Sequence, residues 1–280
     1  MNFDDNQKNI KYADVSVVIP CFCCSETINR AVNSILSQDH LPREIIFVDD
    51  CSCDDGRTLK FLYDIQNKYI NILSIKILQL SKNVGPGSAR NAGWNSASQK
   101  YVALLDADDA WHPNKIRIQE HYMNVNPDVS ICGHGFSFAK NGLNNKCIPE
   151  ESQIVVQHLF PIDFLFKNQF PTSSVMFKRS IPFRFLDGRR YAEDTLLWQQ
   201  ASYNSHPIAR INLPLVFYYK SHYGEGGLSN RLWDMEKGEL SNFILLLKSK
   251  KIGIILFFSS FVFSLLKFIR RYLKTVFYLN

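Results

Sequence analysis

The acidic turn at residues 106–109 is the sharpest cluster of side chains that could do chemistry. Asp106, Asp108 and Asp109 place three carboxylates directly after the apolar run Tyr101–Leu105. Like charges this close repel one another unless a cation or a ligand compensates them. Mg²⁺ and Mn²⁺ prefer oxygen ligands and commonly bridge to phosphates. The turn therefore predicts either a site for a divalent metal and a phosphate or a solvated turn that caps the next helix.

Two further acidic pairs stand beside predicted strands and helices. Asp49 and Asp50 close the apolar run 44–48. One of these carboxylates could accept hydrogen bonds from a ribose or a base, while the other could cap a helix. Glu193 and Asp194 stand at a predicted helix start, where acids favour the helix dipole. The functional alternative for this second pair is a general base that deprotonates an attacking hydroxyl.

The glycine-rich segment 83–93 begins a predicted helix. Such a start allows close backbone approach, and Arg90 within it could reach a phosphate. The segment lacks the Gly-Lys-Ser/Thr of a Walker loop and the Gly-x-Gly-x-x-Gly spacing of a dinucleotide site. Taken alone, it predicts a turn and a helix N-terminus. His222 is a lone candidate for a metal ligand or a phosphate partner.

Alternating strand and helix signals must position these residues. Strands are predicted at 15–19, 44–48, 72–80 and 101–105, and helices at 25–36, 58–67 and 83–97. Further along, 129–181 mixes strands with a short helix near 161–167, a helix begins at 193, and a strand covers 212–220. This order predicts an open, mainly parallel α/β sheet flanked by helices. Because crossovers are right-handed, Asp50 and Asp106 are expected to face one crevice at the strands' carboxyl ends.

Composition and charge exclude several classes of function. Of the 280 residues, 46% are hydrophobic, which excludes a disordered or a fibrous protein. The formal net charge is +6. Residues 240–280 hold seven Lys/Arg and no acid, which leaves 25 bases against 26 acids in residues 1–239. Because the positive charge belongs to the tail, the body is not expected to bind nucleic acid.

The seven cysteines and the polar N-terminus indicate a reduced, cytoplasmic location. The clusters 21–24 and 51–53 invite a zinc interpretation, but neither has the two-residue spacer of the usual zinc knuckle. Thiols that fill the core and a loop are the favoured interpretation.

The C-terminal tail combines an apolar stretch with a basic helix. Residues 252–266 contain no charge, and this stretch is shorter than the roughly 20 residues that a spanning helix needs. Beyond it, Lys267, Arg270, Arg271 and Lys274 fall on one helical face, opposite an apolar face. This pattern predicts helices that attach to an anionic membrane surface in its plane. The alternatives are a helix pair packed on the domain or a homodimer contact. The predicted division is a disordered lead (1–13), a catalytic domain (14–235) and a membrane-association tail (236–280).

The order of the motifs carries more information than any one of them. The chain reads Val17-Val-Ile-Pro20-x-Phe22, Glu44-Ile-Ile-Phe-Val-Asp-Asp50, Asn83-x-Gly85-x4-Arg90-Asn91-x-Gly93, Leu105-Asp-Ala-Asp-Asp109 and Glu193-Asp194-x3-Trp198. This succession resembles the family 2 inverting glycosyltransferases of bacterial surface-polysaccharide synthesis, which use nucleotide sugars and have the GT-A fold. The resemblance covers residues 15–198 closely and extends more loosely to residue 230.

The resemblance implies a nucleotide-sugar site and a divalent cation, Mn²⁺ or Mg²⁺. Pro20 and Phe22 match the end of the first strand, where the family holds the nucleoside. Asp50 matches the aspartate that recognises the uracil or ribose edge, and Arg90 lies close to the nucleotide in relatives. Asp106 matches the first aspartate of the D-x-D pair, which tends to touch the ribose.

The same carry-over assigns the metal and the acceptor side. Asp108 matches the metal-coordinating aspartate, with Asp106 as its companion, and Asp109 could share that duty. Asp194 matches the catalytic base, and Glu193 positions the acceptor. His222 lies where some relatives complete the diphosphate or metal site.

The implied reaction is the transfer of one sugar, a hexose or N-acetylhexosamine, from a UDP-sugar to a glycan or polyprenyl-diphosphate-linked acceptor. It would take place on the inner face of the cell membrane, in the synthesis of O-antigen, capsule or a similar polysaccharide. The Gln-x-x-Arg-Trp motif of processive synthases is absent, which indicates single additions. Two departures, Phe22-Cys23 for Tyr-Asn and Asp49-Asp-Cys-Ser for Asp-Asp-Gly-Ser, affect the donor's identity. A nucleotidyltransferase and a non-catalytic sugar-nucleotide-binding or scaffold protein are the alternatives.

Overall fold

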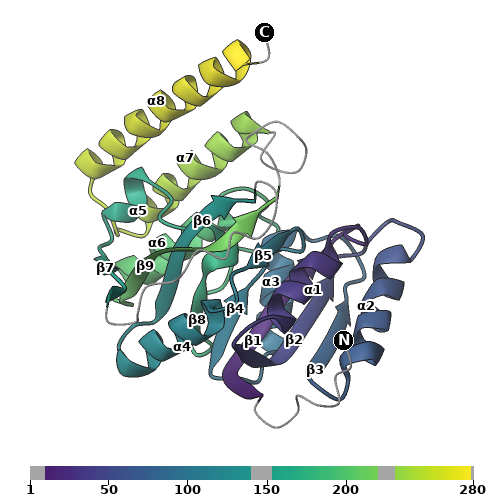
Figure 1. The fold of residues 1–280 in the computed structure, drawn as a ribbon. Helices are drawn as coiled ribbons and strands as arrows, with labels where there is room; N and C mark the ends of the chain where they lie inside the picture. Colours follow the sequence, from purple (N-terminus) through teal and green to yellow (C-terminus); the bar gives the residue numbers. More distant parts are fainter. Residues whose placement is uncertain (1–9, 140–152, 220–230, 279–280) are drawn as a thin grey trace.

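The computed structural model of the chain describes residues 10–139, 153–219 and 231–278. A central mixed sheet is flanked by helices on both faces, and the C-terminal helices α7 and α8 run side by side at its far end (Figure 1). The strands follow one another across the sheet in the order β3-β2-β1-β4-β8-β6-β9-β5, and β7 pairs with β9.

The first half of the chain forms the parallel part of the sheet. Strands β1, β2, β3 and β4 are nearly continuous apolar runs, as strands covered on both faces require. Their order in the sheet makes each connection a crossover through a helix. The elements are β1 (Lys11–Cys21), α1 (Ile28–Leu36), β2 (His40–Asp49), α2 (Arg57–Tyr69), β3 (Ser74–Gln79), α3 (Pro86–Ser96) and β4 (Tyr101–Leu104). All the strands and helices predicted up to residue 105 are confirmed.

The second half adds mainly antiparallel pairs, β4 with β8, β6 with β8, β5 with β9 and β7 with β9, while β6 and β9 are parallel. The elements are β5 (Asp109–Trp111), α4 (Lys115–Val125), β6 (Ile131–Phe138), β7 (Val156–Leu159), α5 (Asp163–Phe166), a 3₁₀ turn (Thr172–Ser174), β8 (Met176–Lys178), α6 (Glu193–Tyr203) and β9 (Ile208–Tyr218).

Successive residues of β1 alternate between two cores. Val17 packs with helices α1, α2 and α4 on one face, and Val18 packs with α3 and α6 on the other. Helix α3 approaches β1 so closely at Gly93 that a Cβ there would lie 2.4 Å from Val18 Cγ1. This close approach holds the start of α3 at the carboxyl ends of the central strands.

The C-terminal helices differ from the predicted tail. Residues 254–278 form one continuous helix, α8 (Ile254–Tyr278), rather than an apolar helix followed by a separate basic one. It packs against α7 (Leu232–Lys248). Lys267 and Arg271 do not share an exposed basic face, because both are ion-paired with acids of α7. Within residues 10–139, 153–219 and 231–278, no helix has both the length and the apolarity that crossing a bilayer requires.

Both predicted domain boundaries fall inside regular structure. Strand β1 starts at Lys11 and pairs with β2 from its first residue, and Ala13 is buried, so the disordered lead predicted at 1–13 is too long. Helix α7 runs across the boundary at 235/236 and packs on the body, as Asn242 Nδ2 donates to the Ala192 carbonyl at 3.0 Å. The tail therefore begins as part of the folded domain.

Candidate active site

A cavity of about 770 Å³ opens at the carboxyl ends of β1, β2 and β4, beside the start of α6. It lies where an α/β sheet is expected to bind its ligand. The structure brings together in its wall eight of the side chains predicted from the sequence: Pro20, Phe22, Asp50, Arg90, Asp106, Asp108, Glu193 and Asp194. His222 lies outside the described residues.

Asp50 holds the loop that leads into α3. Its Oδ1 accepts a hydrogen bond from the Val84 amide at 2.7 Å, and its Oδ2 accepts one from the Gly85 amide at 2.9 Å. Gly85 has a φ of 87°, a left-handed conformation that glycine adopts without strain, and Pro86 then starts the helix. The buried carboxylate thus positions the glycine-rich loop along the cavity.

The acidic turn after β4 divides into two environments. Asp106 and Asp108 line the cavity, whereas Asp109 is buried as the first residue of β5. Ser173 Oγ donates to Asp109 Oδ2 at 2.5 Å and accepts from the Asp106 amide at 3.1 Å. Asp109 therefore anchors the turn to the 3₁₀ segment and does not share the cavity-lining position of the other two aspartates.

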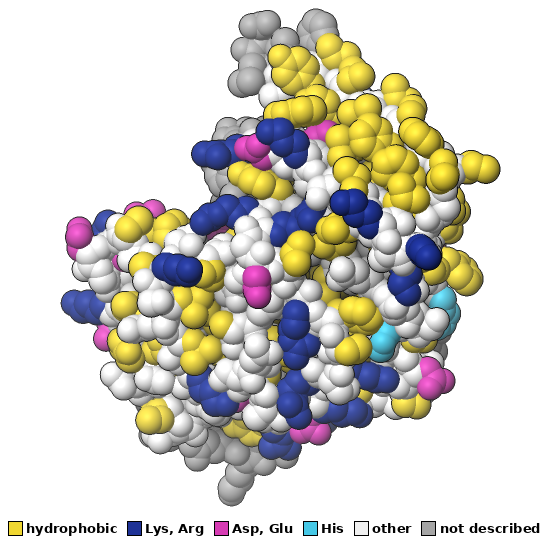
Figure 2. Space-filling model, turned by 180° about the vertical axis from the view of Figure 1, so that it is seen from behind, with side chains coloured by type: hydrophobic (Ala, Val, Ile, Leu, Met, Phe, Trp, Pro, Cys, Tyr) yellow, Lys and Arg dark blue, Asp and Glu magenta, His cyan; other side chains and the backbone are white. Residues whose placement is uncertain are grey.

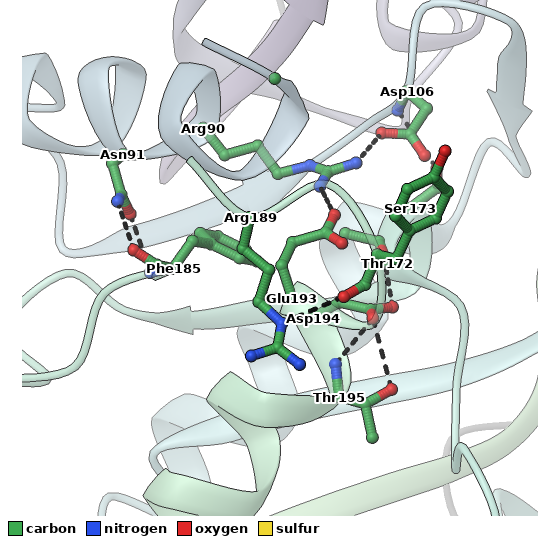
Figure 3. A network of polar contacts seen from close by, with 12 residues as sticks. Arg90, Asn91, Asp106, Thr172, Ser173, Phe185, Arg189, Glu193, Asp194 and Thr195 are labelled. Carbon is green, nitrogen blue, oxygen red and sulfur yellow. Dashed lines mark hydrogen bonds and ion pairs between the residues drawn. The ribbon is translucent and has the colours of Figure 1, made fainter. Parts of the chain in front are cut away.

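Arg90 connects the acidic turn to the start of α6. Its Nη2 donates to Asp106 Oδ1 at 2.7 Å, and its Nη1 donates to Glu193 Oε1 at 3.0 Å (Figure 3). Burial lowers the pKa of the guanidinium, but Asp106 and Glu193 outweigh that effect, so the pKa of Arg90 lies above its usual value. Arg90 is thus a permanent cation that braces two acidic groups.

Helix α6 begins at Glu193 and Asp194, as the sequence predicts. Ala192, just before it, has a φ of 52°, an unfavourable left-handed conformation for alanine. Asp194 Oδ2 accepts from Thr172 Oγ1 at 2.9 Å, and its Oδ1 accepts from the Thr195 amide at 2.7 Å (Figure 3). The carboxylate is held on two sides and remains partly accessible in the cavity wall.

Glu193 and Asp194 occupy different electrostatic environments. Burial first, and then the neighbouring Asp194, raise the pKa of Glu193 to about 7, although Arg90 opposes the shift. Asp194 is less buried than Glu193. Two adjacent carboxyl groups in unlike surroundings suit the assignment of separate roles in acid–base chemistry.

Three side chains of the site were missed at the level of sequence. Thr172 holds Asp194, Ser173 holds the acidic turn, and the phenol of Tyr218 lies among the carboxylates. Burial and then Asp109 raise the pKa of Tyr218, which therefore stays protonated. None of the three belongs to a recognisable motif; only the fold brings them next to the acidic side chains.

The cysteines of the loops after β1 and β2 are free thiols in the described part of the chain. Cys23 and Cys53, from the loops after β1 and β2, have their Sγ atoms 3.7 Å apart. The Cys23 amide donates to Ser52 Oγ at 2.9 Å, which ties the two loops together. The two loops that contain the departures from the family pattern therefore contact each other beside the cavity.

The fit of a divalent cation depends on its donor atoms. Among the residues that the structure describes, no group of three or more His, Cys, Asp or Glu side chains is arranged to share a metal ion. Asp106 and Asp108 nevertheless present carboxylate oxygens from one turn in the cavity wall. Two hard oxygen donors suit Mn²⁺ or Mg²⁺, which commonly take further ligands from a substrate's phosphates.

Comparison with known families decides the class of this fold and site. The model of glycosyl transferase family 2 matches residues 16–186. The chain belongs to this family. The matched region runs from β1 to the loop before α6 and contains the glycine-rich loop and the acidic turn.

Several curated relatives are similar in sequence. The amylovoran biosynthesis glycosyltransferase AmsE of Erwinia amylovora is 29% identical over 235 residues, which cover 82% of this chain and 84% of AmsE. The Escherichia coli UDP-Glc:alpha-D-GlcNAc-diphosphoundecaprenol beta-1,3-glucosyltransferase WfaP is 39% identical over 113 residues, 40% of this chain and 41% of WfaP. For the succinoglycan biosynthesis protein ExoO of Rhizobium meliloti the identity is 36%, over 38% of this chain and 29% of ExoO. The match thus spans less than half the length of ExoO and WfaP.

Solved structures share the fold of this family 2 chain. The S. aureus TarS 1-349 complex with UDP-GlcNAc superposes with a TM-score of 0.64 at 20% identity, over 83% of this chain and 66% of that one. The Pyrobaculum calidifontis mannosyltransferase PcManGT, in complex with GDP-Man and Mn²⁺, gives 0.64 at 16% identity, over 90% and 70%. The architecture is therefore GT-A-like.

Proposed function

We propose that this family 2 protein is an inverting, metal-dependent glycosyltransferase that moves one sugar from a nucleotide-diphosphate sugar to a hydroxyl group. One observation carries the proposal. The acidic turn after β4 and the partly accessible Asp194 at the start of α6, which are far apart in the sequence, line one cavity. A displacement needs a place for the leaving diphosphate and a base for the attacking hydroxyl, and the two acidic groups can serve these separate tasks.

Asp194 is proposed as the general base. Its carboxylate takes the proton of the acceptor hydroxyl, whose oxygen forms a bond to the anomeric carbon while the bond from that carbon to the diphosphate breaks. The electron pair leaves with the diphosphate, so a single displacement inverts the configuration. Thr172 and Thr195 orient the carboxylate, and Glu193 positions the acceptor.

Asp106 and Asp108 are the proposed holders of Mn²⁺ or Mg²⁺. When bound, the cation supplies positive charge that makes the diphosphate a better leaving group. Arg90 is already paired with Asp106, so its proposed contribution is to orient that carboxylate beside the nucleotide. Pro20, Phe22 and Asp50 are the proposed nucleoside contacts.

A UDP-sugar, with a hexose or N-acetylhexosamine, is the proposed donor. The TarS complexes with UDP-GlcNAc and with UDP support a uridine nucleotide, and the PcManGT complex with Mn²⁺ supports the cation. Transfer is proposed to be non-processive, as expected from the missing Gln-x-x-Arg-Trp motif.

The proposed acceptor is a glycan or a polyprenyl-diphosphate-linked glycan of bacterial surface polysaccharide synthesis. The names of AmsE and WfaP support this class. The proposed place of action is the inner face of the cell membrane, since the acid-free segment 240–280 exposes cations that favour an anionic surface, namely Lys248, Lys250, Arg270 and Lys274.

A thermal-shift panel tests the donor site. UDP, GDP, CDP and ADP are each added with and without Mn²⁺ to the full chain, because a ligand that binds only the folded state raises its stability. We expect UDP to raise Tm in a metal-dependent way, and Asp108→Asn to abolish the shift. No shift with any diphosphate, in a folded sample, would favour a non-catalytic scaffold instead.

A further inference from the structure

The side of α8 that packs on the protein carries polar side chains together with Leu256 and Phe257. Ser260 and Ser264 are fully buried against the body. Lys267 Nζ lies 3.2 Å from Glu239 Oε2, and Arg271 Nη2 lies 3.0 Å from the buried carboxylate of Glu236 on α7. A surface helix of a globular protein normally buries its apolar stripe and exposes its polar side. In α8 these four polar side chains are on the packed side instead.

The opposite side of α8 is apolar and exposed. Its large side chains recur every three or four residues, so they form one stripe along the helix. Figure 2 shows hydrophobic side chains gathered at the end of the molecule that α8 forms. We name this stripe the α8 outer face; it consists of Ile254, Ile255, Phe258, Val262, Phe263, Leu266, Ile269, Tyr272 and Leu273, each between 42% and 87% exposed. A continuous apolar stripe of this kind marks an interaction surface.

Cations stand at both ends of the α8 outer face. Lys248 and Lys250 are exposed at the turn between α7 and α8, and Arg270 and Lys274 are exposed near the other end. Residues 240–280 contain no Asp or Glu. Pairing with the same face of a second copy would bring cations near cations without any acid to compensate them. An apolar layer covered by anionic headgroups matches both the stripe and its flanking charges.

Helix α7 lies between α8 and residues 189–192, which lead into Glu193 and Asp194. On one side it is ion-paired to α8 through Glu236 and Glu239. On the other side, Arg189 Nη2 donates to the Gly238 carbonyl at 2.6 Å, and Met235 lines the cavity. The α8 outer face is therefore connected through α7 to residues 189–192, which lead into Asp194 at the start of α6.

We propose that the α8 outer face docks flat on an anionic lipid bilayer and holds the catalytic cavity beside it. The two ion pairs keep the packed side of α8 on α7, so the outer face alone enters the interfacial layer. This deepens the proposed function, on which the consequence for catalysis rests: a membrane-anchored acceptor would reach Asp194 directly from the surface.

Vesicle flotation of the full chain tests the docking face. The vesicles are phosphatidylcholine alone, or phosphatidylcholine mixed in equal parts with phosphatidylglycerol. We expect binding to the anionic vesicles, and a loss of at least about tenfold in the triple variant Ile255→Ser, Val262→Ser, Leu266→Ser. Equal binding by the wild type and this variant would overturn the proposal. So would a wild-type dimer that the variant converts to monomer while neither binds vesicles, since the face would then be a dimer contact.

A matched triple variant, Tyr63→Ser, Ile70→Ser, Val125→Ser, replaces exposed side chains on α2, just after α2 and at the end of α4. It should bind vesicles as the wild type does; an equal loss here would overturn the assignment to α8. The Tm shift by UDP with Mn²⁺ is measured on every variant. A retained shift in the α8 variant, with vesicle binding lost, separates docking from the donor site. Vesicle binding by a wild type that no nucleotide stabilises would refute the proposed function and leave the docking face intact.

Discussion

Arg90 and Glu193 form a buried ion pair at 3.0 Å that joins helix α3 to the first residue of α6. The same guanidinium binds Asp106 at 2.7 Å. One cation therefore spans the acidic turn proposed for the donor and the acidic pair proposed for the acceptor. Any change in the charge of one group is felt by the other two, because both acids contact one buried guanidinium.

Replacing Arg90 tests this bracing role. Arg90→Met leaves Glu193 and Asp106 without their cation, and removing one partner of a buried pair costs roughly 3 kcal/mol in the free energy of unfolding. The matched control is Arg43→Met, because Arg43 pairs with Asp14 on the surface and such pairs contribute about 1 kcal/mol or less. Urea denaturation measures both. Equal losses in the two variants would show that Arg90 does not brace the site.

The local part of the site could be predicted from the sequence. Apolar runs that end in Asp50 or Asp106 place those carboxylates at the strands' carboxyl ends by rule, and the structure finds both in one cavity. The partners of Arg90 were not predictable in the same way. Glu193 is 103 positions away from Arg90 in the sequence. The sequence near Arg90 indicates only a phosphate contact, and nothing in it shows that two carboxylates pair with the guanidinium.

The C-terminal helix shows a second limit of sequence patterns. Periodicity found the basic and apolar sides of α8 and assigned the basic helix to an anionic membrane surface. The acids that neutralise Lys267 and Arg271 lie on α7, 28 and 35 positions earlier. Only the helix pairing shows that the apolar side is the one left exposed.

Stability should depend on pH through Glu193. Burial and Asp194 raise the pKa of Glu193 in the folded state to about 7, from its ordinary value of 4.5. Between these values the folded state keeps a proton that the unfolded state has lost, so the free energy of unfolding falls as pH rises through this window, by up to about 3 kcal/mol. We expect Glu193→Gln to flatten that fall in urea titrations at pH 4.5 to 7. An unchanged slope would show that Glu193 ionises normally.

Asp194→Asn should abolish transfer without loss of the nucleotide. Losing the general base lowers kcat by about 10²- to 10⁴-fold. The Tm shift with UDP and Mn²⁺ should persist, because that shift depends on the acidic turn. The measurement is UDP release from the sugar nucleotide that the enzyme uses. Wild-type turnover in this variant would refute the role of Asp194 as the base.

Thr172→Val should have a smaller effect of the same kind. It removes the 2.9 Å hydrogen bond that orients Asp194 Oδ2, which corresponds to roughly 1 kcal/mol, or several-fold in kcat. The Thr195 amide still holds the other oxygen. Turnover as low as that of Asp194→Asn would instead point to Thr172 itself as a substrate contact.

Gly238→Ala should disturb Tyr191 and Ala192, which come just before α6, because Gly238 lies on the side of α7 that contacts them. A Cβ at this position would lie 2.7 Å from the Tyr191 carbonyl oxygen, a backbone atom just before Ala192 and the acids of α6. Alanine favours helices over glycine by about 1 kcal/mol, but overpacking of this kind costs about 1–3 kcal/mol, so we expect a net loss of stability together with lower kcat. Gly253→Ala is the control, since nothing lies within 4 Å of a Cβ there. Suppose that Gly238→Ala were as stable and active as Gly253→Ala. Helix α7 would then not hold the residues just before α6 in place, and contacts at α8 could not be transmitted through α7 to Asp194.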